Sequence, residues 1–176
     1  MKTILNGTQL AITIDRLCHQ LIENHLNFED AVLIGLQPRG IYLSDRIYRT
    51  LQKLLPGTPI SYGKLDITFY RDDFNKGHAL HVPNETDINF SIENKRVVLI
   101  DDVLYTGRTT RSALDAMLDF GRPASVELLV LIDRRFTRQL PIQADYTGRT
   151  IDAIISEKVR VLWNERDGKD EVIILE

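Results

Sequence analysis

The chain has 176 residues, enough for one domain that buries roughly 70% of its unfolded surface. Its 22 basic and 25 acidic side chains give a formal net charge of -3, so bulk basicity does not indicate nucleic-acid binding, which would need a local basic patch. The single cysteine, Cys18, excludes an internal disulfide and a cysteine-cluster metal site, and no apolar run approaches the ~18 residues of a membrane span. These features predict a soluble, cytoplasmic protein.

The first third of the chain predicts two helices separated by a strand. Apolar residues recur at helical spacing over 10–22, and Asn6 or Thr8 can cap this helix. The apolar run over 31–36 does not alternate with polar residues, which is typical of a strand covered on both faces. Apolar spacing over 43–54 predicts the second helix. Strand, short loop and helix form the unit of a parallel α/β sheet, so we expect the loop at the carboxyl edge, where such sheets bind ligands.

The next part of the chain combines a strand with a long loop. Leu65, Ile67 and Phe69 alternate with polar neighbours, which predicts a strand. Residues 74–94 then show little periodicity and include many polar side chains. A loop of this length inside a compact domain is usually functional or mobile.

The last third predicts further α/β elements and a terminal hairpin. Apolar residues over 113–118 predict a helix that Gly121 ends, and the run 126–132 predicts another buried strand. The tail predicts two strands, over 159–163 and 171–175, joined by turn residues. The whole pattern indicates an α/β fold with a mostly parallel twisted sheet flanked by helices.

The motif with the strongest chemical signal follows the strand-like run 97–100. That run ends in two adjacent carboxylates, Asp101 and Asp102, which can accept hydrogen bonds from the vicinal hydroxyls of a sugar. Thr106 and Gly107 form a small turn, and the amides after it would open a helix whose N-terminus attracts an anion. The motif predicts a site for a ribose with a phosphate on its 5-carbon, whereas the acidic pair taken alone also fits an ordinary solvated loop.

The run Asp-Asp-Val-Leu-Tyr-Thr-Gly-Arg-Thr at 101–109 resembles the phosphoribosyl pyrophosphate (PRPP) signature of type I phosphoribosyltransferases. Its details resemble the PyrR family, which combines regulation of pyrimidine operons with uracil phosphoribosyltransferase activity. The resemblance covers essentially the whole chain and implies one phosphoribosyltransferase domain over 1–176. It also implies a flexible flap over about 71–95 and a small hood over about 133–158 plus the C-terminal hairpin. The implied reaction converts uracil and PRPP to UMP and pyrophosphate.

The resemblance implies roles for the motif residues. Asp101, Asp102 and Arg39 are the expected catalytic residues, with the carboxylates facing the ribose and Arg39 on the leaving pyrophosphate. The residues expected to bind the phosphoribosyl group are Tyr105, Thr106, Gly107, Arg108, Thr109 and Thr110. The expected cofactor is Mg²⁺, which would contact mainly ligand oxygens and water, so no direct protein ligand is expected apart from Asp101 and Asp102.

The loop after the first strand resembles the pyrophosphate loop of the same family. It contains Pro38, Arg39 and Gly40, although an ordinary turn with a solvated arginine is the alternative. In the family, a small polar residue commonly precedes this arginine and a strained cis peptide joins the two. Pro38 holds that place here, so a cis Pro38–Arg39 bond would be a non-proline cis bond.

The resemblance also implies a flap that closes over PRPP and a pocket for the base. Arg71 and Asp72 would lie at the base of the flap, whose closure excludes water from an oxocarbenium-like transition state. A surface ion pair with Asp72 or Asp73 is the alternative for Arg71. Asp133 and Arg134 would shape the base pocket, and Tyr146 would stack on the base.

RNA binding is a second hypothesis, because the resemblance implies a regulator that binds the leader of pyrimidine-operon mRNA when loaded with UMP. Arg16, His19 and Arg149 match the expected RNA face. Asp15 stands where relatives carry a neutral hydroxyl residue, and Gln143 stands where they carry arginine. These two departures remove favourable charge, so we rank the enzyme above the regulator.

Other functions compete with these two. A purine-type phosphoribosyltransferase fits the same motif, because base choice depends on a few pocket contacts. An RNA-binding attenuator with weak enzyme activity is a further alternative. A receiver-type signalling domain would use an acidic cluster after a strand, but it would need a lysine after a later strand, where this chain has Asp133 and Arg134. The resemblance implies a homodimer or homotetramer.

Overall fold

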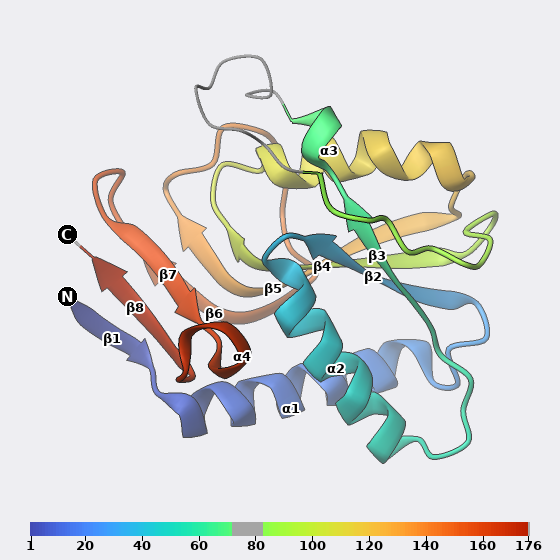
Figure 1. Cartoon of the computed structure of the whole chain (residues 1–176), viewed down its shortest axis with the longest axis horizontal. Helices are drawn as coiled ribbons and strands as arrows, with labels where there is room; N and C mark the ends of the chain where they lie inside the picture. Colours follow the sequence, from blue (N-terminus) through green and yellow to red (C-terminus); the bar gives the residue numbers. More distant parts are fainter. Residues whose placement is uncertain (72–82, 176) are drawn as a thin grey trace.

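The computed structural model describes residues 1–71 and 83–175. Its main sheet has five strands in the order β3-β2-β4-β5-β6, and every neighbouring pair is parallel (Figure 1). The strands are β2 (Ala31–Gln37), β3 (Ser61–Asp66), β4 (Arg96–Leu104), β5 (Ser125–Arg135) and β6 (Tyr146–Asp152). The structure confirms the predicted α/β fold.

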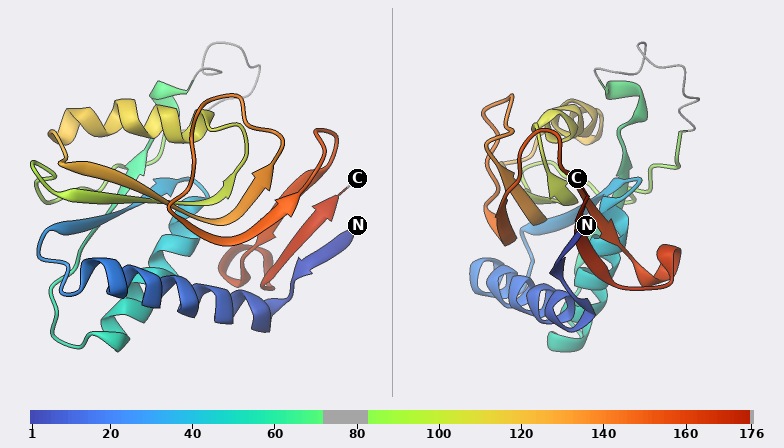
Figure 2. Two further views of the ribbon diagram at one scale, coloured as in Figure 1. Left: turned by 180° about the vertical axis from the view of Figure 1, so that it is seen from behind. Right: turned by 90° about the vertical axis from the view of Figure 1, so that its left-hand side faces the viewer.

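Helices cover both faces of this sheet. Helices α1 (Gly7–His25) and α2 (Gly40–Leu54) pack on one face, and α3 (Arg108–Met117) packs on the other (Figure 2). The strand β2 is buried along its whole length because it lies between these layers. Asn6 caps α1 with a complete capping box, which confirms one of the two expected caps. None of the described helices is long and apolar enough to cross a membrane.

A second, smaller sheet brings both ends of the chain together. It has the antiparallel order β1-β8-β7, formed by β1 (Lys2–Leu5), β7 (Lys158–Leu162) and β8 (Glu171–Leu175). The one-turn helix α4 (Asn164–Asp167) joins β7 to β8, which confirms the predicted hairpin. Within the range expected for the hood, 133–158, strand β6 pairs with β5 in the main sheet. The small sheet instead takes in β1, which the sequence pattern does not predict.

The structure also corrects the strand expected through Phe69. Strand β3 ends at Asp66, and the 3₁₀ helix η1 (Thr68–Tyr70) follows it. The Asp66 carboxylate accepts hydrogen bonds from the amide and the hydroxyl of Thr68, which favours a turn over an extended strand. Phe69 is therefore 65% exposed and does not continue the apolar face of β3. A second 3₁₀ helix, η2 (Leu118–Phe120), follows α3.

Candidate active site

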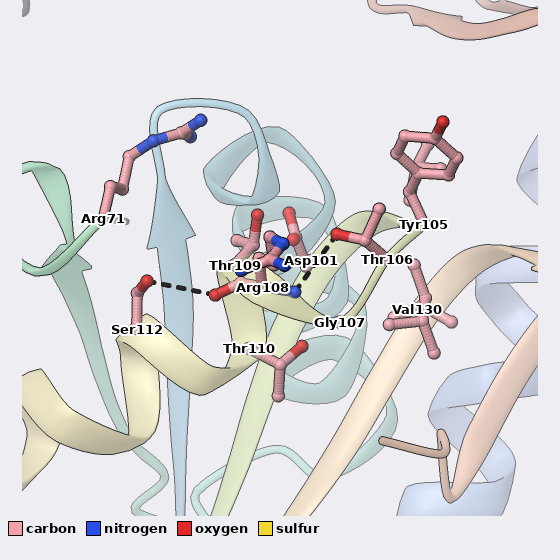
Figure 3. Close-up of a pocket in the computed structure, with 12 residues that line it drawn as sticks. Arg71, Asp101, Tyr105, Thr106, Gly107, Arg108, Thr109, Thr110, Ser112 and Val130 are labelled. Atoms are coloured by element: carbon pink, nitrogen blue, oxygen red, sulfur yellow. Dashed lines mark hydrogen bonds between the residues drawn. The ribbon is translucent and has the colours of Figure 1, made fainter. Parts of the chain in front are cut away.

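Two cavities flank the carboxyl end of β4. The first, of about 280 Å³, is lined by all six expected phosphoribosyl-binding residues, together with Asp101 and Arg71 (Figure 3). The second, of about 310 Å³, is lined by Asp102, Arg39, Arg134 and residues 158–161. Val103 lines both cavities. The acidic pair therefore lies where a ligand can extend from one cavity into the other.

The turn at Thr106 and Gly107 forms an anion-binding loop at the start of α3. Gly107 has a φ of 91°, in the left-handed region that favours glycine, and it offers no side chain to cap the helix. The Arg108 amide donates to the Thr106 hydroxyl at 3.3 Å, which tightens the turn (Figure 3). The helix N-terminus thus faces the first cavity, as the sequence motif predicts.

The acidic pair is almost fully buried beneath the two cavities. Asp101 is 8% exposed and Asp102 is 6% exposed. Burial raises the pKa of Asp101 well above its usual range, and the charge of Asp102 raises it further. Burial also raises the pKa of Asp102, although the Arg39 guanidinium, 3.2 Å away, opposes that rise. Two carboxylates in this setting can hold a proton at neutral pH more readily than exposed ones.

Arg39 connects the acidic pair to the small sheet. Its Nε contacts the Asp102 carboxylate, and its Nη2 donates to the carbonyl of Val161 at 2.7 Å. Gly40 lets this loop lie close to β4, because a Cβ there would be 2.6 Å from the Ile100 carbonyl oxygen. The cis peptide of this loop is the X–Pro bond Gln37–Pro38.

Arg134 lies where the base pocket is expected. Its side chain is buried, with Nη2 donating to the carbonyls of Ile154 and Glu157, while its buried Nε has no hydrogen-bond partner among the described residues. Burial lowers the pKa of this guanidinium, which stacks on the Tyr105 ring at 4.1 Å. The stack joins a residue of the second cavity, Arg134, to a residue of the first, Tyr105. Asp133 lines neither cavity and instead pairs with Arg138.

The expected stacking of Tyr146 on the base is wrong. Tyr146 begins β6 and pairs with Leu129, so it lies toward the amino edge of the parallel sheet, away from both cavities. It is 4% exposed, and its hydroxyl donates to the Glu127 carboxylate at 2.6 Å. Burial and this carboxylate raise the pKa of the phenol. Tyr146 is a core residue whose polar end is satisfied inside the protein.

The residues of the expected RNA face lie on α1 and β6. Arg16 donates to the Gly148 carbonyl at 2.5 Å, and Arg149 donates to the Ile4 carbonyl at 3.1 Å. His19 is exposed and lies 3.7 Å from the Asp15 carboxylate. The structure therefore brings Arg16 and Arg149 to neighbouring positions. Both guanidiniums already have partners within the chain.

Two charged residues of the second cavity are not singled out by the sequence pattern. Lys158 and Arg160 line that cavity from β7. Their i, i+2 spacing at the start of the predicted strand 159–163, which β7 extends by one residue to Lys158, is the available signal, because it places both side chains on one face. Of the expected flap residues, Arg71 lines the first cavity, whereas Asp72 lies outside the described residues.

Comparison with known proteins agrees with this geometry. Residues 1–166 match the family model described as "Phosphoribosyl transferase domain". The "Bifunctional protein PyrR" of Desulfosudis oleivorans is 47% identical, with 97% of this chain and 94% of that protein covered. The protein of the same name from Chloroflexus aurantiacus is 46% identical, with 99% and 94% covered.

Solved structures show the same fold at lower identity. A hypoxanthine phosphoribosyltransferase of Trypanosoma cruzi superposes with a TM-score of 0.74 at 18% identity, covering 99% of this chain and 96% of that one. A hypoxanthine phosphoribosyltransferase of Staphylococcus aureus superposes with a TM-score of 0.71 at 22% identity, covering 97% of this chain and 90% of that one. Since the family model and the two PyrR proteins match nearly the whole chain, the chain belongs to the phosphoribosyltransferase domain family and, within it, to the PyrR family.

Proposed function

We propose that the protein transfers the phosphoribosyl group of PRPP to uracil, which forms UMP and releases pyrophosphate. The observation that carries this proposal is the position of the acidic pair between an anion-binding loop and a second, cation-lined cavity. The first cavity suits the 5-phosphate, because the helix N-terminus and the threonine hydroxyls offer donors there. The ribose then lies over the acidic pair, and its anomeric carbon faces the second cavity.

The reaction breaks the bond between the anomeric carbon and a pyrophosphate oxygen, and it forms a bond from that carbon to a uracil nitrogen. Positive charge develops on the ribose as pyrophosphate leaves, and the carboxylates of Asp101 and Asp102 stabilise that charge. Arg39, Lys158 and Arg160 attract the departing anion. The uracil nitrogen loses a proton, which Asp102 is placed to accept at the edge of the second cavity.

Magnesium fits this site because adjacent carboxylates are the hard oxygen donors that the ion prefers. Asp101 and Asp102 would hold it together with oxygens of the ligand and water. When bound, the ion supplies positive charge that neutralises the pyrophosphate.

A product assay tests the proposal directly. The protein is incubated with PRPP and Mg²⁺, and uracil, hypoxanthine and guanine are offered in parallel. We expect UMP and pyrophosphate with uracil and little product with either purine. If a purine is turned over preferentially, the acceptor is that purine and not uracil. If no base causes the release of pyrophosphate, phosphoribosyl transfer itself is contradicted.

We infer a second function, UMP-dependent binding to the leader of pyrimidine-operon mRNA. The relatives that support it are named bifunctional, and Arg16 and Arg149 lie near each other across α1 and β6. Asp15 beside His19 and the neutral Gln143 reduce the positive charge available to RNA. A mobility shift of the organism's own leader RNA, with and without UMP, tests the proposal. If the RNA does not shift in either condition, the RNA-binding function is refuted and only the enzymatic function remains.

A further inference from the structure

The segment 137–140, between β5 and β6, holds two consecutive carbonyls of the phosphate-binding loop. The Tyr105 carbonyl accepts a hydrogen bond from Arg138 Nη1 at 2.7 Å. The Thr106 carbonyl accepts hydrogen bonds from the amides of Gln139 and Leu140, at 3.0 and 3.2 Å. The loop is therefore fastened from outside the cavity that it lines.

This fastening determines where the loop amides point. In a planar trans peptide the N–H and C=O bonds point in opposite directions. Holding the carbonyls of Tyr105 and Thr106 toward segment 137–140 turns the amides of Thr106 and Gly107 away from that segment. Both residues line the first cavity, so these amides are available to a phosphate there.

Arg138 has a second partner that fixes its guanidinium. Its Nη2 lies 2.5 Å from Oδ1 of Asp133, which belongs to the carboxyl end of β5. The two side chains are 24% and 17% exposed, so solvent screens this pair less than a surface pair. One guanidinium thus bridges a rigid strand and a loop carbonyl, while Arg138 lines neither cavity.

We propose that Arg138, braced by Asp133, is a positioning residue that presents the amides of the phosphate-binding loop to PRPP. The proposal rests on PRPP being the phosphoribosyl donor. Without Arg138, the Tyr105 carbonyl keeps the longer hydrogen bond from the Thr137 hydroxyl, at 3.5 Å, so it can rotate more freely, and the amide of the same peptide rotates with it. Loss of Arg138 therefore weakens phosphate binding without removing any group that touches the ligand.

Calorimetric titration of PRPP and of UMP into the full chain tests this role, together with steady-state kinetics. We expect Arg138→Ala to weaken the binding of both ligands by about tenfold, because a charge-assisted hydrogen bond is lost. The KM for uracil is expected to change by less than about twofold, since the proposed function puts uracil in the second cavity, which residues 105–107 do not line. Arg138→Lys retains the charge without the planar fork and should recover part of the affinity.

Two further variants separate positioning from general destabilisation. Arg135→Ala is the matched control, because Arg135 forms an exposed pair with Asp152 of the neighbouring strand β6 and lines neither cavity. As a single substitution, Asp133→Asn should weaken the binding of PRPP. In the Arg138→Ala background it should cause no further loss of affinity, since Asp133 acts through the same guanidinium.

The outcomes distinguish this proposal from the proposed function. If the unaltered protein binds neither PRPP nor UMP, the phosphoribosyltransferase assignment fails. If it binds both, and Arg138→Ala binds them within twofold of the unaltered protein, the positioning role is refuted while the enzyme stands. An equal rise in the KM values for PRPP and uracil would also refute it, because that result indicates general damage to the site.

Discussion

Asp101 and Asp102 are neighbours in sequence, yet they line different cavities. Successive side chains of a strand point to opposite faces, so a doublet at a strand end reaches both cavities, and in the proposed function both carboxylates face the ribose. Among the described residues, Asp102 forms an ion pair with Arg39, whereas Asp101 forms none. The pKa of Asp101 is raised by burial and by its neighbour, which makes its charge costly in the free protein.

The raised pKa of Asp101 predicts a pH-dependent gain in stability for Asp101→Asn. A carboxyl whose pKa is higher in the folded state than in the unfolded state destabilises the fold once pH exceeds both values, and it has no such effect below the unfolded pKa. We therefore expect a higher Tm for the variant at pH 7 and equal Tm values near pH 3.5. Thermal unfolding of both proteins at a series of pH values measures the difference. A Tm difference independent of pH would contradict this account.

Replacing both carboxylates tests their catalytic role. The Asp101→Asn, Asp102→Asn double variant keeps the shape of the site but removes the negative charge that faces the ribose. We expect turnover to fall by at least about a thousandfold, since electrostatic stabilisation is a large part of such catalysis. Pyrophosphate release is the measurement, and a circular dichroism spectrum confirms folding. Retained uracil-dependent release would exclude the pair from catalysis.

At the scale of elements, continuous patterns are predictable and long-range pairings are not. The strand 31–36, the helix 43–54 and the loop from Tyr105 to Thr110 follow from local spacing and turn chemistry, and the structure contains all three. Strand β1 has only four residues and is fixed by pairing with β8, which lies at the other end of the chain. The place of Tyr146 depends on the register of β6 against β5, which local sequence does not specify.

Arg46 shows how α2 is joined to the small sheet. Its guanidinium pairs with Glu165 and Asp170 and lies 4.9 Å from the centroid of the Trp163 ring. Hydrogen bonds from Arg46 lower the pKa of Glu165. Burial alone would raise the pKa of Asp170, but the hydrogen bonds from Arg46 and from the Asn164 amide outweigh burial, so the pKa of Asp170 is also lowered. Depressed carboxyl pKa values stabilise the fold above the unfolded values, and this stabilisation is lost as pH falls through the folded ones.

We therefore predict that Arg46→Ala destabilises the protein by about 1–2 kcal/mol at pH 7, a value reduced for partial exposure of the carboxylates. The difference in unfolding free energy should shrink toward pH 3. Urea unfolding at several pH values measures it. Arg46→Lys should restore little, because it lacks the fork that pairs two carboxylates. PRPP affinity should stay unchanged, and a parallel loss of affinity would mean that this cluster also shapes the site.

For the whole molecule, the second cavity is shared between the two sheets. Arg39 and Asp102 come from the carboxyl edge of the main sheet, whereas Lys158 and Arg160 come from β7 of the small one. Arg39 joins the sheets through its bond to Val161. The phosphate-binding loop is a continuous stretch of sequence and is predictable, but this cavity exists only after β7 has docked. The sequence motif alone therefore identifies one half of the site.

The shared cavity predicts a ligand-dependent effect for the Lys158→Ala, Arg160→Ala double variant. PRPP carries a pyrophosphate in addition to the 5-phosphate, whereas UMP carries the 5-phosphate alone, so the two cations should matter more to PRPP. We expect PRPP to bind about tenfold more weakly and UMP to change by less than about twofold, each loss being smaller at high salt. Titrations of both ligands at two salt concentrations measure this. Equal weakening of PRPP and UMP would instead place the 5-phosphate, rather than the pyrophosphate, beside β7.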